Sequence, residues 1–226
     1  MHSHTVNNNS RAIKRKSLSQ IVADELRKRI WTGELTFGER LLEADLSSEL
    51  DISRSSLREA MQTLEYEGLV VNKARKGTFV YNFTKHDMKE INELRYLIEI
   101  PALIKTVSHI TDHDIEYLKQ LLDDMTRLLE EENWYKLFNL DMTFHLTLVN
   151  LCGNSRIIKT YKVIQTQIRT FLSQLEPFYA QNKTMFTQEH SMLLDAFKAR
   201  DEEAVERLAK AHIKQVAVSL DFLESF

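Results

Sequence analysis

The segment of this chain that most restricts its fold is SRSSLREA, residues 53–60. It lies between the apolar-patterned run LLEADLSSELDI and the run MQTLEYEGLVVNKARKGTFV. The pattern predicts a short helix over 43–50, a turn at Asp51, and a second helix that begins at Ser53 and ends before Gly68. Two strands, LVVN and GTFVY, then pair across ARKG. Two helices followed by a two-stranded wing form a winged helix-turn-helix, which binds DNA.

Arg54 and Arg58 are four residues apart, so they project from one face of the second helix. A recognition helix presents this face to the major groove, where arginine binds guanine O6 and N7. Hydroxyls that could bind phosphate lie at the same helix end, on Ser53, Ser55 and Ser56. The predicted wing carries basic residues and a turn glycine, Lys73, Arg75, Lys76 and Gly77. The alternative is a pair of solvated arginines on an ordinary helical hairpin.

Charge is divided unevenly along the chain. Residues 1–85 hold 14 Lys and Arg against 11 Asp and Glu, whereas residues 86–226 hold 16 against 22. The positive part suits DNA, although four of its charges lie in residues 1–16, which we expect to form a flexible basic arm. A single cysteine excludes an internal disulfide, and no apolar run reaches the roughly 18 residues of a membrane span. We therefore expect a soluble, cytoplasmic protein without a membrane partner.

The rest of the chain is predicted to be helical almost throughout. A helix over 18–31 precedes the helix-turn-helix, and six more are expected at 85–109, 112–132, 134–151, 155–175, 184–200 and 202–224, with a break at Glu176-Pro177. The fold class is therefore mainly α. A winged helix-turn-helix occupies residues 17–83, and a six-helix antiparallel bundle occupies residues 84–226.

Four residues of the bundle could bind a metal ion. Asp141 and His145 share one helix face, while His190 and His212 lie among apolar residues of two later helices. Three imidazoles and one carboxylate suit zinc, nickel, iron or manganese. Two other interpretations stay open at this point, since an Asp-His pair can be a surface hydrogen bond and a lone histidine can be a satisfied core residue.

Residues 17–80 resemble the DNA-binding domain of the GntR family of bacterial regulators, through GERLLEADLSSEL, SRSSLREAMQTLEYEGLV and KGTFV. The resemblance implies that Arg54 and Arg58 contact DNA and that Gly77 forms the wing tip. Ser56 stands where many members have proline, and Ala44 stands where some have a further DNA-contacting arginine. These two departures leave the operator sequence open.

Residues 85–226 resemble the FCD effector domain of the FadR subfamily, through INELRYLIEIPAL, LDMTFHLTLVNLCGN, EHSMLLDAF and AKAHI. The resemblance implies that the aspartate and three histidines named above hold a metal, with zinc first among the ions considered, and its length suggests the VanR-like group. It also places Arg95 near an effector pocket, unless Glu99 holds it in a salt bridge. Tyr161 and Arg169 are further candidates to line that pocket.

Together these features predict a homodimeric repressor, not an enzyme, that binds a pseudo-palindromic double-stranded DNA operator. A small carboxylate metabolite bound at the metal would control its DNA affinity. Two alternatives accompany this hypothesis. The metal could be purely structural, or the site with its open coordination could belong to a metal-dependent enzyme.

Overall fold

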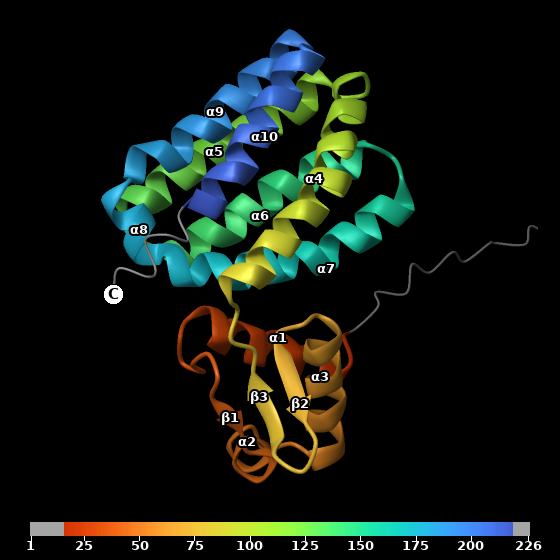
Figure 1. Ribbon diagram of the computed structural model, residues 1–226, viewed down its shortest axis with the longest axis vertical. Helices are drawn as coiled ribbons and strands as arrows, with labels where there is room; N and C mark the ends of the chain where they lie inside the picture. Colours follow the sequence, from red (N-terminus) through yellow and green to blue (C-terminus); the bar gives the residue numbers. More distant parts are fainter. Residues whose placement is uncertain (1–15, 219–226) are drawn as a thin grey trace, which may run out of the picture.

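The computed structural model describes residues 16–218, with side chains described as far as Gln215. Figure 1 shows a small N-terminal domain of helices and strands, and a larger C-terminal domain made of helices alone. The predicted basic arm, apart from Lys16, and the predicted end of the last helix at 219–224 lie outside the described residues. In the part of the chain that is described, no helix is both long enough and apolar enough to cross a membrane.

The N-terminal domain has the predicted winged helix-turn-helix arrangement. Its elements are α1 (Leu18–Trp31), β1 (Arg40–Leu41), α2 (Glu43–Glu49), α3 (Arg54–Tyr66), β2 (Val70–Lys73) and β3 (Gly77–Val80). The wing is a three-stranded antiparallel sheet in the order β1-β3-β2, whereas two strands were predicted. The sequence prediction missed β1 because a two-residue strand is too short to show apolar alternation. It pairs Arg40 with Phe79 and Leu41 with Thr78.

Local signals in the sequence place these helices. Ser17 caps α1, since its side chain accepts a hydrogen bond from the Gln20 amide and the Gln20 side chain bonds back to the Ser17 amide. The apolar faces of α1 and α3 then meet, and the side chains of Leu26, Leu57 and Leu64 are fully buried there. This packing fixes the outward face of α3, which carries the two arginines.

The C-terminal domain contains the six predicted helices. They are α4 (Lys85–Val107), α5 (Asp112–Glu130), α6 (Trp134–Leu151), α7 (Ser155–Leu172), α9 (Lys183–Ala199) and α10 (Glu202–Val218). The predicted break at Glu176-Pro177 is wrong. A 3-10 turn, Ser173–Leu175, and the short helix α8, Glu176–Gln181, continue the chain there. Pro177 lies in the first turn of α8, where its missing N–H leaves no hydrogen bond unmade.

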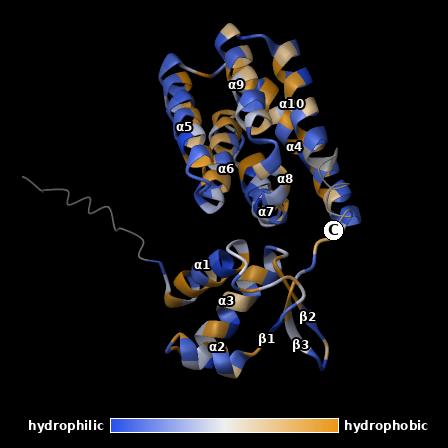
Figure 2. Ribbon diagram, turned by 90° about the vertical axis from the view of Figure 1, so that its left-hand side faces the viewer, coloured by the Kyte–Doolittle hydropathy of each residue, from blue (hydrophilic) through white to orange (hydrophobic). Residues whose placement is uncertain are grey.

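The bundle helices surround an apolar interior. Helix α10 packs against α4 and α9, α6 packs against α5 and α7, and α7 also packs against α4. Figure 2 shows apolar residues on the facing sides of these helices and hydrophilic residues on their outer sides. Phe138, Phe144 and Phe197 are among the fully buried side chains. Polar groups on the inner faces therefore lie in an environment where they need partners.

Helix α7 joins the two domains. The indole Nε1 of Trp31, the last residue of α1, donates to Thr170 Oγ1 at 2.8 Å. The amide Nε2 of Gln167 donates to the carbonyl oxygen of Glu67, the C-cap of α3, at 3.1 Å. One bundle helix thus contacts the ends of both α1 and the recognition helix.

Substituting Gly68 measures how much the hydrogen bond between Gln167 and Glu67 contributes to the free energy of unfolding. Gly68 has a φ of 75°, and a Cβ there would lie 2.5 Å from Gln167 Nε2. Gly33 has a φ of 77° with no described atom within 4 Å of an added Cβ. Both Gly68→Ala and Gly33→Ala should lower the free energy of unfolding by about 1–2 kcal/mol because of the left-handed backbone. Gly68→Ala should cost about 1 kcal/mol more because it displaces the hydrogen bond.

Urea unfolding followed by circular dichroism provides the comparison. In a Gln167→Ala background the extra cost of Gly68→Ala should vanish, so that both glycine substitutions cost the same. If Gly68→Ala still costs more than Gly33→Ala when the Gln167 side chain is absent, the extra cost does not come from the Gln167 hydrogen bond.

Candidate functional site

The exposed face of α3 carries the predicted DNA-contacting residues. Arg54, Ser55 and Arg58 are exposed at its N-terminal end. The Ser53 hydroxyl acts as the helix cap, because its Oγ accepts the Ser56 amide hydrogen at 3.1 Å and lies 2.9 Å from Ser56 Oγ. Ser53 and Ser56 therefore shape the helix end, while the arginines remain available at the surface.

Arg58 has an intramolecular partner at this surface. Its Nε donates to Glu43 Oε2 of α2 at 2.8 Å, and 63% of the arginine side chain is exposed. An exposed pair of this kind contributes little to stability, about 0–1 kcal/mol. A phosphate or a base could therefore replace Glu43 at low cost.

The wing places its basic residues at the tip of a hairpin. Lys73 pairs with Gly77 in the sheet, and the Lys76 amide donates to the Lys73 carbonyl at 2.9 Å across the turn. Lys73, Arg75 and Lys76 are exposed, and Lys73 Nζ lies 4.9 Å from the centre of the Phe79 ring. Gly77 opens β3 directly after the turn.

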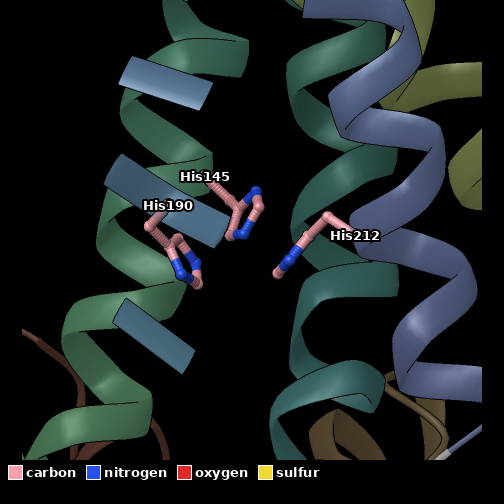
Figure 3. Close-up of side chains that lie close together, drawn as sticks. All are labelled: His145, His190 and His212. Atoms are coloured by element: carbon pink, nitrogen blue, oxygen red, sulfur yellow. The ribbon is translucent and has the colours of Figure 1, made fainter. Parts of the chain in front are cut away.

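Three bundle helices bring the predicted metal ligands together. Asp141 and His145 come from α6, His190 from α9 and His212 from α10. Figure 3 shows the three imidazoles pointing toward one another, and each offers a nitrogen within 4.8 Å of the others, so the three histidines could hold a metal ion. Asp141, His145 and His190 are buried, and 12% of the His212 side chain is exposed.

The Asp141 carboxylate faces the same point. Its Oδ1 lies 2.6 Å from His190 Nε2 and 3.7 Å from His145 Nε2. Within the described residues, these three buried atoms have no aligned hydrogen-bond partner. Leaving a buried polar atom unpaired costs about 1–3 kcal/mol. A divalent cation among them would satisfy all three, so the residues present fit a metal ion.

The other ring nitrogens face acceptors outside the cluster. His190 Nδ1 is hydrogen bonded to the Phe186 carbonyl at 2.6 Å, and His212 Nδ1 to Glu189 Oε2 at 2.9 Å. His145 Nδ1 lies 2.7 Å from Glu99 Oε1, although the two atoms are not aligned as a hydrogen bond. Each imidazole is thus oriented with Nε2 toward the shared centre. Sequence reasoning did not identify Glu189, although it directly precedes His190.

The protonation of the cluster follows from its burial and its neighbours. Burial raises the pKa of Asp141, but the adjacent His190 and the other two imidazoles outweigh burial and lower it to about 2. Burial lowers the pKa of His212 well below its ordinary value, and the neighbouring histidines lower it further. Burial lowers the pKa of His190, but its contact with Asp141 outweighs burial and raises it. Of these groups, Asp141 and His212 are thus held in the forms that bind metal, an ionised carboxylate and a neutral imidazole.

The predicted effector-binding residues lie in two places. Arg95 is buried and its Nε donates to Glu99 Oε2 at 2.7 Å, so the salt bridge named as an alternative is present. Tyr161 is fully buried, and its hydroxyl has no hydrogen-bond partner in residues 16–218. One turn before Arg95, Asn92 is also buried, with neither amide atom partnered among the described residues. Sequence reasoning missed Asn92.

Arg169 lies at the junction of the domains. Its Nε donates to Asn139 Oδ1 at 2.9 Å and its Nη2 to the Tyr135 carbonyl at 3.1 Å. The guanidinium carbon lies 4.8 Å from the centre of the Trp31 ring. Burial lowers the pKa of Arg169 to about 10. Its contacts therefore connect α7 with α6 and with the end of α1.

A winged helix-turn-helix joined to a helical domain defines a DNA-binding transcription regulator with a separate effector domain. Residues 18–80 match the bacterial regulatory proteins of the gntR family, and residues 90–215 match the FCD domain. The chain belongs to the GntR family of regulators, and its second domain is an FCD domain.

Known relatives have the same character. The Nta operon transcriptional regulator of Aminobacter aminovorans is 29% identical over 178 residues, 79% of this chain and 82% of its own. The HTH-type transcriptional repressor NanR of Citrobacter rodentium is 25% identical over 235 residues, 93% and 88% of the two chains. A GntR-type regulator from Rhodococcus sp. RHA1 superposes with a TM-score of 0.79 at 25% identity, over 91% of this chain and 98% of that one. The protein is a regulator and not an enzyme.

If the cluster binds a metal, folding and metal binding must be linked. At a free Zn²⁺ concentration 100 times the Kd, the free energy of unfolding should rise by about 2.7 kcal/mol. Thermal unfolding with Zn²⁺ and with a chelator measures this rise. His190→Gln should remove the response to metal, whereas His113→Ala, at an exposed position on α5, should leave it unchanged. An equal response in both variants would place the bound metal elsewhere.

Proposed function

We propose that this chain is a metal-dependent repressor of the FadR subfamily, similar to the VanR-like group, whose operator affinity a small organic acid controls. The observation that carries the proposal is the convergence of Asp141, His145, His190 and His212 on one buried point. The facing atoms of Asp141, His145 and His190 lack hydrogen-bond partners among the described residues, which is unfavourable in a core unless an ion is bound. Zinc is our first choice, with nickel, iron and manganese as alternatives.

The proposed DNA contacts follow from exposure and charge. Arg54 and Arg58 would contact bases, or phosphates beside them, in the major groove. Phosphate contacts would come from Ser55 and from the basic wing residues Lys73, Arg75 and Lys76, with the Gly77 turn close to the backbone. Ser53 and Ser56 would contribute through the geometry of the helix end, where the Ser53 hydroxyl caps the Ser56 amide. Repression is supported by the relative named as a transcriptional repressor.

The bound metal would supply a Lewis-acidic position for an effector carboxylate. Among the described residues, the Tyr161 hydroxyl has no hydrogen-bond partner and could bind the effector. Arg95 would contribute positive charge, while its Nε hydrogen bond goes to Glu99. Arg169, at the other end of α7, would respond to the position of this helix. A small carboxylate matches the charge of the metal and the hydrogen-bond donors nearby.

Helix α7 provides the physical connection between the sites. Tyr161 lies in the bundle interior, and Gln167 and Thr170 on the same helix bond to the DNA-binding domain. In a homodimer with two-fold symmetry, a shift of α7 would change the spacing of the two recognition helices relative to a pseudo-palindromic operator. Effector binding and DNA binding would then be coupled, and reciprocally so.

The DNA contacts can be tested by alanine substitution. On a DNA site selected from a random library, Arg54→Ala should weaken binding by about 1–3 kcal/mol and relax the base preference at the contacted position. Lys76→Ala should weaken binding to all DNA sequences alike. It should also reduce the slope of log affinity against log salt concentration by about 1. Lys119→Ala, on the exposed face of α5, serves as the control. Unchanged DNA affinity for Arg54→Ala would remove Arg54 from the interface.

The effector hypothesis can be tested with Zn²⁺-loaded protein and a panel of acids such as acetate, lactate, malate and citrate. One acid should lower operator affinity by about 5- to 150-fold, the usual range of allosteric coupling. The His190→Gln variant should bind the operator without responding to the acid. An acid that binds the metal-loaded bundle yet leaves operator affinity unchanged would refute the induction mechanism.

A purely structural metal is the second candidate, and the deep burial of Asp141, His145 and His190 favours it. In that case the ion would hold α6, α9 and α10 together without any metabolite. Metal removal would then lower thermal stability, and no acid would alter operator affinity in either form.

A further inference from the structure

We propose that Glu99 and Glu189 are positioning residues of the metal centre, each holding one ligand imidazole at Nδ1 so that its Nε2 faces the ion. We infer further that Arg95 serves this centre by anchoring Glu99. The inference rests on the proposed metal site, and it assigns roles to carboxylates that are not themselves ligands.

Glu99 is set between Arg95 and His145. Its Oε2 accepts the Arg95 Nε hydrogen at 2.7 Å, and its Oε1 lies 2.7 Å from His145 Nδ1, within reach of a hydrogen bond that a small ring rotation would align. All three side chains are at most 2% exposed. Glu99 therefore lies between a buried guanidinium, which it accepts from, and the imidazole of a proposed ligand.

Glu189 plays the matching part on the other side of the cluster. It precedes His190 on α9, but its Oε2 is hydrogen bonded to His212 Nδ1 on α10 at 2.9 Å. Its side chain is 28% exposed, so the contact closes the less buried side of the site. The carboxylate thereby fixes the ring of one helix from the neighbouring helix.

These contacts decide which nitrogen can ligate. A neutral imidazole carries one proton, and an acceptor at Nδ1 keeps that proton there and leaves the Nε2 lone pair free. His190 obtains the same orientation from the Phe186 carbonyl. Loss of such an orienting partner typically weakens metal binding about 10- to 100-fold. Arg95 supports this orientation indirectly, because its Nε and Nη2 both donate hydrogen bonds to Glu99.

The test uses Co²⁺ as the probe, with no organic acid present. Glu189→Ala should bind Co²⁺ about 10- to 100-fold more weakly than the natural chain, in competition with a chelator, and should change the visible absorption of the bound ion. Glu189→Gln, which keeps a carbonyl acceptor, should restore part of the affinity. Glu206→Gln on α10, where Glu206 pairs with Lys210, is the matched control and should bind normally.

For Glu99, the double variant Arg95→Met/Glu99→Gln removes both charges together, which buried pairs often tolerate. It should also bind Co²⁺ more weakly, and nitrogen NMR should show the His145 proton shared between Nδ1 and Nε2 instead of held at Nδ1. If the natural chain binds Co²⁺, and the Glu189→Ala and Arg95→Met/Glu99→Gln variants bind it with the same affinity and the same absorption spectrum, the inference is wrong but the metal centre stands. No Co²⁺ binding by the natural chain would instead overturn the metal centre itself.

Discussion

The structure depends on one arrangement in its core, a carboxylate and three imidazoles that face a single point. An apolar core tolerates such an arrangement only when a bound ion or hydrogen bonds satisfy these groups. Asp141 Oδ1 lies 2.6 Å from His190 Nε2, and both atoms lack an aligned hydrogen bond among the described residues. In the interior each such unpaired atom costs about 1–3 kcal/mol, so the cluster by itself disfavours the folded state. A cation at the centre would reverse this balance, and it would make the packing of α6, α9 and α10 depend on the ion.

The two domains are connected by few but specific contacts. Helix α7 bonds to the end of α1 through Thr170 and Trp31, and to the end of α3 through Gln167 and Glu67. Arg169 lies over the Trp31 ring and donates a hydrogen bond to the Tyr135 carbonyl of α6. Helix α7 thus borders the bundle interior and also contacts the end of the recognition helix α3. It can transmit a small displacement from the bundle to the DNA-binding domain, because packed interfaces shift between discrete arrangements.

Much of this organisation was predictable from the sequence because it arises locally. The caps of α1 and α3 and the apolar periodicity of the bundle helices follow from residue order, whereas the shared site of the ligand helices was implied by the resemblance to the FCD domain. The strand β1 was missed because pairing of Arg40 and Leu41 depends on β3, which is distant in sequence. The continuation through Pro177 was missed because proline both ends helices and begins them. The partners of Arg95 and Arg169 were settled by tertiary packing, which no spacing rule reveals.

The most direct measurement of the central claim is anomalous scattering from a crystal of the metal-loaded protein, collected at the absorption edge of the bound metal. The account predicts one strong peak per chain, about 2.0–2.2 Å from Nε2 of His145, His190 and His212 and from an Asp141 carboxylate oxygen. A bundle interior without a peak, or a peak coordinated by other residues, would contradict it.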